Sequence, residues 1–335
     1  MYMKQSLKNS IHGIEALTGA FLGRVGRYSP PVSLKLYRLF VFLNRRLPDR
    51  LMLWLEPFSS ALGDALFDLS IPVPETARLR GVGMMRLDLS EKTQRQIFSH
   101  KCFEAGLSRY IGSVLRPGDT FVDVGANVGY FTLLSASLVG NKGAVLAIEP
   151  EEKNFASLGD NVTANAYTNT LLCRCAAGVE EKEEILNVNP LNRCGNSMLP
   201  FDTYASGETR FSKEEMIARF GEKELFERVG MRTLDGLFDE YGLGDVAMMK
   251  IDVEGFELAV LQGCLVRLAR GSIRRIVCEV NNSATRRDVF SLFQRYGYAP
   301  YRLSFAGKPE RLPADTPLER IQGNVLFAQT PEHTL

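Results

Sequence analysis

The chain has few of the residues on which metal and redox enzymes commonly depend. It contains three histidines (His12, His100 and His333), which lie far apart, and its six cysteines form no Cys-x-x-Cys pair. Zinc sites and dithiol redox motifs are usually recognised in a sequence by closely spaced cysteines and histidines, such as Cys-x-x-Cys. We therefore expect no zinc site, and we interpret the cysteines as free thiols in a reducing cytoplasm.

Long apolar runs and a strong net charge are also absent. No stretch reaches the roughly 18 apolar residues that a membrane-spanning helix requires, and the first 30 residues lack the apolar core of a signal peptide. The net charge of +1 over 335 residues argues against a nucleic-acid partner. We predict a cytoplasmic protein.

Charge is nevertheless uneven along the chain. Residues 1–60 carry nine Lys and Arg against three Asp and Glu, and their leucines recur at near-helical spacing between prolines. This pattern predicts a helical N-terminal extension over residues 1–85, packed on the main domain. A second interpretation is that its basic face rests peripherally on anionic lipid at the inner membrane face.

Two glycine motifs of nucleotide-binding proteins are missing. The chain has no Gly-x-x-x-x-Gly-Lys-Ser/Thr phosphate loop, which disfavours an NTPase, and no Gly-x-Gly-x-x-Gly dinucleotide fingerprint. Instead, an apolar run ends at Asp123 and continues into Gly125 and Gly129, four residues apart. This predicts a buried strand, a tight turn and a helix, with room for a nucleoside-bearing ligand close to bare backbone.

Strand and helix patterns alternate from about residue 86. The expected strands cover residues 120–124, 144–149, 170–175, 245–251, 273–280, 298–303 and 324–328. Such alternation predicts an α/β fold, a Rossmann-like, doubly wound, seven-stranded sheet. We place this domain at 86–330 with its core at 117–304. Residues 180–231 interrupt the rhythm as a lid insertion, with an amphipathic helix at 212–228.

Acidic residues end the first two expected strands, at the edge where doubly wound sheets bind ligands. Glu149 follows Gly129 by 20 residues and is placed to accept hydrogen bonds from ribose hydroxyls. Its alternative is an exposed acid beside a helix. Asp123 would hold the glycine loop or accept a hydrogen bond from an ammonium group. The alternative interpretation is that Asp123 has a structural role and forms an Asx turn.

The segment from Lys250 to Glu257 is denser in charge than a structural strand end requires. It contains Lys250, Asp252, Glu254 and Glu257 after an apolar strand. Helix capping explains one or two of the carboxylates. It does not explain a lysine within a buried strand, where a charge is normally paired or functional. We predict that this segment is the second half of a site.

Together these motifs resemble the FkbM family of S-adenosylmethionine-dependent methyltransferases, over about residues 86–328. The motifs that carry the resemblance are Pro117-Gly118-Asp119, Asp123–Gly129, Glu149-Pro150, Lys250–Glu257, Leu261-Gln262-Gly263, Phe103-Glu104 and Gly323–Phe327. The resemblance implies a sheet of the class I methyltransferase type. It also implies methylation of a hydroxyl on a sugar, glycan or small natural product.

Carried onto this sequence, the resemblance divides the site into two halves. The S-adenosyl-L-methionine half comprises Asp123, Gly125, Ala126, Asn127, Gly129 and, at the ribose, Glu149. The acceptor half comprises Lys250, Asp252, Glu254 and Glu257. We hypothesise that Asp252 is the general base or orients the acceptor, with Lys250 and Glu254 setting its charge state.

Three alternatives remain open from the sequence. A less favoured mechanism places Mg²⁺ on Asp252, Glu279 and Asn281, which end neighbouring strands. A second alternative is a binding protein at a membrane surface that keeps the methyltransferase fold but has lost catalytic activity. An NAD(P)-dependent oxidoreductase would share the fold, but the glycine spacing disfavours it. The sequence contains no signal for an oligomeric state.

Overall fold

The structure is a computed structural model that describes residues 34, 35, 37–39, 41, 42, 73–190, 192–200 and 212–329. They divide into two compact units, one within residues 34–80 and 84–103 and the other of residues 81–83 and 104–329. Most of the basic segment 1–60, and with it the predicted membrane contact, lies outside the described residues.

The first unit contains a hairpin and helices. Strands β1 (Pro74–Leu79) and β2 (Gly83–Asp88) form a two-stranded sheet, followed by helix α5 (Lys92–His100). Described residues between 34 and 42 are helical, and the Tyr37 hydroxyl lies 2.7 Å from that of Ser99. The prediction of a helical extension over residues 1–85 is therefore wrong in its last part, because β1 and the start of β2 lie there. The predicted boundary at residue 85 falls inside β2. Alternating burial in both strands is the period-2 signal of a sheet.

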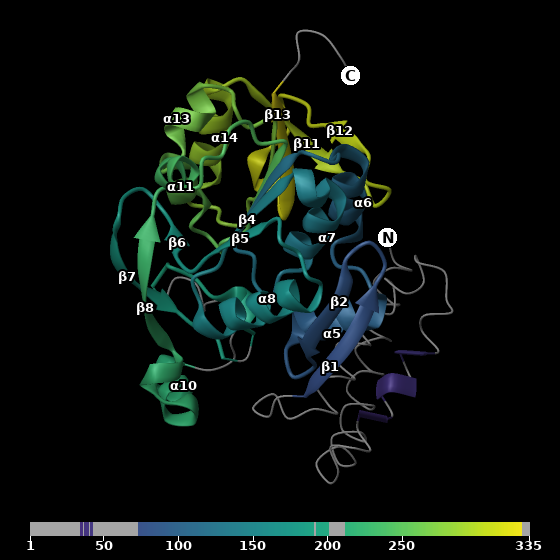
Figure 1. Cartoon of the computed structure of the whole chain (residues 1–335). Helices are drawn as coiled ribbons and strands as arrows, with labels where there is room; N and C mark the ends of the chain where they lie inside the picture. The colour runs from purple at the N-terminus through teal and green to yellow at the C-terminus, as the bar shows by residue number, and fades with distance from the viewer. Residues whose placement is uncertain are drawn as a thin grey trace, which may run out of the picture. The chain divides into compact units, whose positions relative to one another are not determined.

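A mainly parallel sheet of eight strands organises the second unit (Figure 1), in the order β12-β11-β13-β10-β9-β3-β4-β5. The strands are β3 (Thr120–Val124), β4 (Ala144–Ile148), β5 (Thr170–Cys173), β9 (Met248–Ile251), β10 (Arg275–Glu279), β11 (Tyr298–Leu303), β12 (Pro309–Arg311) and β13 (Asn324–Gln329). Seven of them were expected. Short β12 pairs with β11 at the sheet edge and adds an eighth.

The strand order creates a switch point at β3. Strands β4 and β9 flank β3 in parallel, and the chain passes outward from β3 to β4 and β5 before returning to β9. Strand β13 runs antiparallel between β10 and β11. This topology confirms the doubly wound fold, and it places the ends of β3, β4 and β9 beside the crevice where such sheets bind ligands.

Helices cover both faces of the sheet. They are α6 (Ala105–Val114), α7 (Tyr130–Val139), α8 (Glu152–Ala164), α11 (Leu234–Glu240), α12 (Glu257–Gln262), α13 (Leu265–Ala269) and α14 (Arg286–Arg295), with single turns η1 (Gly140–Lys142) and η4 (Leu318–Arg320). Figure 1 shows α11, α13 and α14 on one side and α6 and α7 on the other. Val122 and Val124 pack toward α11 and α12. Asp123, between them, therefore faces α7.

The region expected to be a lid insertion folds as a second, small sheet. Strands β6 (Ala176–Ala177), β7 (Lys182–Asn187) and β8 (Phe226–Arg232) form it in the order β6-β8-β7, with η2 (Arg193–Gly195), α10 (Lys213–Phe220) and η3 (Glu222–Glu224) in the same region. The helix predicted at 212–228 begins as expected, with a capping box between Ser212 and Glu215. It ends at Phe220 because Gly221, at φ 86°, turns the chain into η3, which precedes β8.

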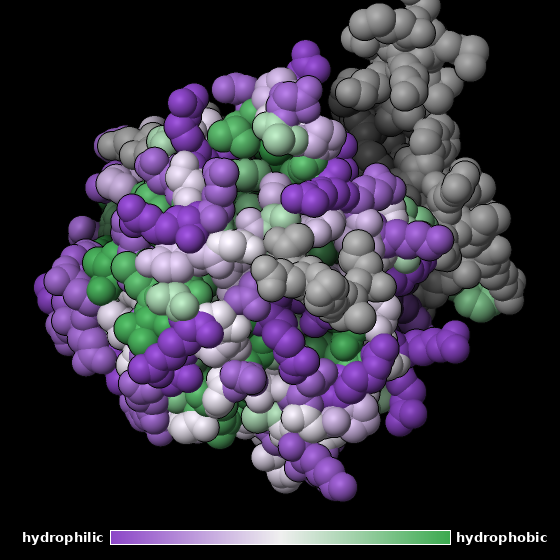
Figure 2. Space-filling model, turned by 90° about the horizontal axis from the view of Figure 1, so that it is seen from above, coloured by the Kyte–Doolittle hydropathy of each residue, from purple (hydrophilic) through white to green (hydrophobic). Residues whose placement is uncertain are grey.

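The described surface carries no dominant apolar patch in the view of Figure 2, where hydrophobic residues form separate groups among charged ones. The exposed large hydrophobic side chains of the second unit are Val179, Ile185, Val266 and Phe305. None of the helices in the described part of the chain combines the length and apolar content that crossing a bilayer takes.

Candidate functional site

The glycine loop after β3 is shaped by its contacts with the two neighbouring strands. The amides of Gly125 and Ala126 both donate to the carbonyl of Ile148 at the end of β4, at 3.0 Å. A Cβ atom on Gly125 would lie 1.9 Å from the carbonyl oxygen of Asp252, after β9. Glycine at 125 thus lets the loop approach the backbone of the Lys250–Glu257 segment, and it joins the two predicted halves of the site.

We expect Gly125→Ala to destabilise the protein by about 2–5 kcal/mol. The new Cβ meets backbone that must move, and φ at this position is 77°. The matched control is Gly118→Ala, where φ is 93° but nothing lies within 4 Å, and which should cost about 1 kcal/mol. Urea unfolding measures both; equal losses would show that the close approach to Asp252 is unimportant.

Glu149 is buried against the glycine loop. Its Oε2 accepts from the amide of Asn127 at 2.8 Å, and its Oε1 accepts from the amide of Glu151 at 3.1 Å. Asn127 itself adopts a left-handed φ of 51°. Burial raises the pKa of Glu149 to about 7 despite these amide donors, which act in the opposite direction. The predicted ribose acid and the predicted cofactor loop therefore form one hydrogen-bonded unit.

Lys250 lies beside two of the predicted carboxylates. Asp123 and Lys250 are register partners on β3 and β9, and the Lys250 ammonium donates to Asp252 Oδ2 at 2.9 Å. The hydroxyl of Thr132 on α7 donates to Asp123 Oδ2 at 2.6 Å. Burial alone would lower the pKa of Lys250, but Asp252, Asp123 and Glu104 outweigh burial and raise it. The lysine remains charged and offsets the negative charge around it.

Glu104 joins this group from outside the strand ends. Its Oε1 accepts from Asn324 at 2.8 Å, and its electrostatic neighbours are Asp252 and Lys250. Burial, followed by repulsion from Asp252, raises the pKa of Glu104 to about 7. Sequence reasoning noted this residue only as part of a family motif, because it lies 19 residues before Asp123 and on no expected strand end.

Glu257 and Glu254 lie differently from Asp252. Glu257 is buried, and its Oε1 accepts from the amide of Gly255 at 2.8 Å, so it turns inward onto its own loop. Burial raises the pKa of Glu257 to about 7. Glu254 adopts φ 51°, and its carbonyl accepts from the Ser197 hydroxyl at 2.7 Å. Of the four residues predicted for the acceptor half, Lys250 and Glu257 are buried, whereas Asp252 and Glu254 are partly exposed.

Asp252, Glu254 and Glu279 gather at the ends of β9 and β10, with one carboxylate oxygen from each within 4.8 Å of the others. Burial, and then repulsion from Asp252 and Glu254, raises the pKa of Glu279 to about 10. Asn281 donates to Glu279 and accepts from the amide of Gly323, so its oxygen is engaged by backbone. A cation bound here would therefore have Glu254 as its third ligand, in place of the predicted Asn281.

Residues 192–200 bridge the two halves of the site, which the sequence did not reveal. The Asn127 side chain donates to the Cys194 sulfur at 3.4 Å, on the cofactor side. On the acceptor side, Ser197 contacts Glu254, and a Cβ on Gly255 would meet Leu199. Only the position of this segment after β7 brings it here; it has no periodic pattern that would have indicated a site.

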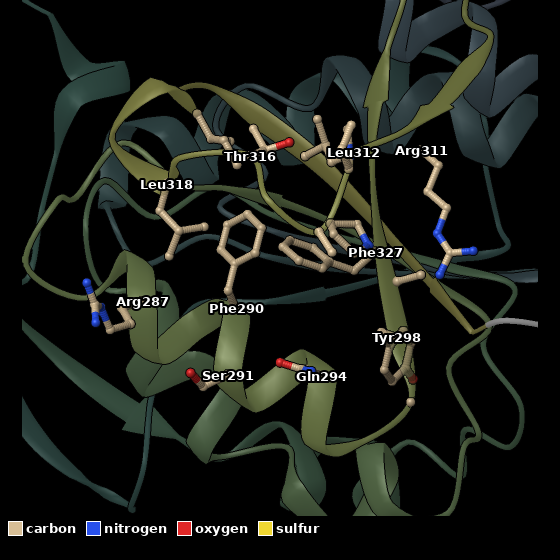
Figure 3. Close-up of a pocket in the computed structure, with 16 residues that line it drawn as sticks. Arg287, Phe290, Ser291, Gln294, Tyr298, Arg311, Leu312, Thr316, Leu318 and Phe327 are labelled. Carbon is tan, nitrogen blue, oxygen red and sulfur yellow. The ribbon is translucent and has the colours of Figure 1, made fainter.

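A cavity of about 790 Å³ lies elsewhere in the second unit, between α14, β11 and the chain from Arg311 to Ile321 (Figure 3). Phe290 and Phe327 line it with ring centroids 5.1 Å apart. None of the predicted site residues is among its lining residues. Its size alone therefore does not connect it with the chemistry at the strand ends.

The buried acids predict a pH dependence of stability. The folded pKa values of Glu149 and Glu257 are raised from 4.5 to about 7. An acidic group whose pKa is higher in the folded protein than in the unfolded chain contributes stability at pH values below its unfolded pKa. This contribution is lost as the pH rises through its folded pKa. Without added cofactor, we expect the free energy of unfolding to fall by about 1–3 kcal/mol per group between pH 4.5 and 8.

Glu149→Gln and Glu257→Gln should each flatten this slope. The control is Glu224→Gln, which removes an exposed acid whose pKa is lowered, first by a hydrogen bond from Lys153. Denaturant titrations at a series of pH values measure the slope. A stability that rises from pH 5 to 8 in the wild type would contradict the prediction.

Comparison with known proteins identifies the family of the chain. The chain matches the Methyltransferase FkbM domain over residues 123–300, more than half of its length. Methyltransferase 1 of Beauveria bassiana is 27% identical over 175 residues, 52% of this chain and 66% of the relative, so the match spans just under two thirds of that protein. The 31-O-demethyl-FK506 methyltransferase FkbM of Streptomyces tacrolimicus is 28% identical over 240 residues, 68% of this chain and 89% of the relative.

Among solved structures, the SAM-dependent O-methyltransferase of Thermotoga maritima aligns with a TM-score of 0.35 and 12% identity, covering 78% of this chain and 79% of that one. So distant an alignment carries no argument about chemistry. The family match starts at Asp123 and includes Glu149 and the Lys250–Glu257 segment. The chain belongs to the FkbM methyltransferase family, and S-adenosyl-L-methionine is its cofactor.

Proposed function

We propose that the protein transfers the methyl group of S-adenosyl-L-methionine to a hydroxyl of a sugar, glycan or natural-product acceptor, with Asp252 as the general base. The observation that carries this proposal is the placement of Asp252. Its side chain is 24% exposed and is paired at 2.9 Å with buried Lys250. Its backbone also abuts Gly125 of the cofactor loop.

The cofactor supplies an activated methyl group on a sulfonium. The protein has to hold the acceptor oxygen in line with that group and remove the hydroxyl proton as the oxygen attacks. Glu149, next to the loop amides, would hold the ribose. Asp252 would accept the proton, and Lys250 would keep the carboxylate oriented. Glu254 and Glu279 would lie on the acceptor side, where their carboxyl groups can exchange hydrogen bonds with a hydroxylated acceptor.

The name of one relative is consistent with an oxygen acceptor. The Streptomyces tacrolimicus protein is named for the methylation of 31-O-demethyl-FK506. At 28% identity, that name does not transfer an acceptor to this chain. The oxygen-directed chemistry that we propose here rests instead on a partly exposed carboxylate beside the cofactor loop.

Transfer of isotopically labelled methyl groups tests the proposal. The protein is incubated with labelled cofactor and fractions of glycans, lipids and small metabolites, and the labelled products are examined by mass spectrometry and NMR. We expect label in base-stable methyl ethers. Label confined to nitrogen, sulfur or carbon, or tight cofactor binding with no transfer to any fraction, would contradict it.

The magnesium-assisted mechanism is tested in the same assay. Asp252, Glu254 and Glu279 are hard oxygen donors of the kind that Mg²⁺ takes. If they bind it for catalysis, transfer should stop on exhaustive chelation and return with added Mg²⁺. Transfer that survives chelation leaves Asp252 acting as a base without a metal.

A further inference from the structure

Two cysteines meet at the end of β5, next to the cofactor half of the site. The sulfur atoms of Cys173 and Cys175 lie 3.3 Å apart, and neither is in a disulfide. The carbonyl of Cys173 accepts from the amide of Glu149 at 3.1 Å. A pair of thiols in contact is therefore attached to the backbone that holds the predicted ribose acid.

The local chain geometry allows these sulfurs to bond. Residues two apart on a strand face the same side, and Arg174 between them pairs with Glu227 on the other side, at 2.6 Å. Two extended residues span about 6.6 Å, which is within the roughly 4.4–6.8 Å between Cα atoms that a disulfide accepts. A bend at Cys175 shortens this span.

The two thiols differ in the way that oxidisable pairs do. Cys173 is half-buried, whereas Cys175 is 4% exposed. The hydrogen bond from Cys175 lowers the pKa of Cys173 to about 7; Tyr241 and Arg232 act in the same direction, and burial and Glu240 oppose them. The same contact and burial raise the pKa of Cys175. Cys173 is thus the accessible nucleophile, and Cys175 is the partner within reach.

We propose that Cys173 and Cys175 form a peroxide-sensitive dithiol that closes reversibly to an intrachain disulfide. The Cys173 thiolate attacks a peroxide oxygen, which breaks the O–O bond and yields a sulfenic acid and hydroxide. The Cys175 sulfur then displaces the sulfenic oxygen and forms the S–S bond; its proton and the leaving oxygen end in water. The two sulfurs lose two electrons, and hydrogen peroxide becomes two waters.

Closure would act on the cofactor site. The sulfurs must approach from 3.3 Å to about 2.05 Å, which pulls on the strand end whose carbonyl accepts from Glu149. We expect the oxidised protein to bind S-adenosyl-L-methionine about fivefold more weakly, the effect of one lost hydrogen bond. This consequence rests on the proposed role of Glu149, whereas disulfide formation does not.

Trypsin distinguishes the bridge from other oxidation products, because Arg174 separates the two cysteines. Wild-type protein is treated with hydrogen peroxide, its remaining thiols are alkylated and it is digested without reductant. Cleavage after Lys153, Arg174 and Lys182 releases peptides 154–174 and 175–182. We expect them to be joined by a disulfide that dithiothreitol opens. Alkylated, separate peptides, or a bridge between two chains on a non-reducing gel, would overturn the proposal.

Two variants and a control sharpen the result. Cys175→Ser and Cys173→Ser should each abolish the joined peptides. In Cys175→Ser, the sulfenic acid formed on Cys173 has lost the thiol of Cys175 as its partner, so it should be oxidised further to sulfinic acid. Cys102→Ser, which removes a partly exposed thiol outside the pair, should leave the bridge intact. Thermal melts confirm that each variant is folded. A bridge that persists in Cys173→Ser would overturn the assignment.

Calorimetric titration of S-adenosyl-L-methionine tests the consequence. Oxidised wild type should bind about fivefold more weakly and recover with dithiothreitol, while peroxide-treated Cys102→Ser should match the wild type. Unchanged affinity in fully bridged protein would overturn the link to Glu149. Protein that binds no cofactor in either state but still forms the bridge would contradict the proposed function and leave the dithiol standing.

Discussion

Replacing Asp252 with asparagine is expected to lower methyl transfer by about 10²–10⁴-fold, the usual contribution of a placed general base. The substitution keeps the size of the side chain and removes its capacity to accept a proton. Affinity for S-adenosyl-L-methionine should change little, because the Asp252 side chain accepts its hydrogen bond from Lys250 and not from the glycine loop. Turnover on the acceptor found by isotope labelling, together with calorimetric cofactor binding, measures the two effects.

The control for Asp252→Asn is Asp239→Asn. Asp239 also pairs with a largely buried base, Arg267, but it lies on α11, away from the strand ends. It should therefore report the cost of losing an ion pair without touching the site. Turnover within a few-fold of wild type in Asp252→Asn, with cofactor binding retained, would exclude Asp252 as the base.

The course of the sheet followed from the sequence because the central parallel strands β3, β4 and β9 are mostly apolar and are buried along most of their length. Strand β3 was expected at 120–124 and lies there. The turn at Gly125 was predicted because an apolar run ends in an acid and is followed by glycine. The β1–β2 hairpin was missed because its buried residues, such as Met85 and Leu87, alternate over only a few positions. Strand β12 was missed because three exposed residues at a sheet edge carry no apolar signal.

Candidate site residues could be proposed from the sequence where they lie at strand ends, and not where tertiary contacts bring them together. Asp123, Glu149 and Lys250 were proposed because charged residues at the ends of buried strands are conspicuous. Nothing in the sequence indicated that Cys194 and Ser197 would contact the two halves, since their positions depend on how residues 192–200 cross the strand ends. The site role of each residue stays a prediction until the variants are measured.

Lys250→Met should be the most destabilising of the proposed changes, at about 3–5 kcal/mol at neutral pH, because it removes one partner of a buried charge cluster. Lys250 is 3% exposed, and Asp123, at 1%, lies beside it on β3. Burial already raises the pKa of Asp123, and Lys250 acts in the opposite direction. Without the ammonium, the Asp123 carboxylate would be left buried, and the hydrogen bond from Thr132 would have to stabilise its charge.

A double-mutant cycle separates this charge effect from lost packing. If Lys250 mainly compensates Asp123, then Asp123→Asn/Lys250→Met should recover about 1–3 kcal/mol relative to the sum of the two single changes. Lys250→Met alone should also regain stability as pH falls, because protonation of the acids relieves the uncompensated charge. Additive losses that do not vary with pH would mean that Lys250 stabilises the strand through its aliphatic stem and its ammonium, 5.3 Å from the centre of the Phe131 ring. A compensated pair would explain why the family motif places a lysine two residues before its acid: the cation allows a carboxylate to be buried on β3 and orients Asp252 at the adjacent strand end.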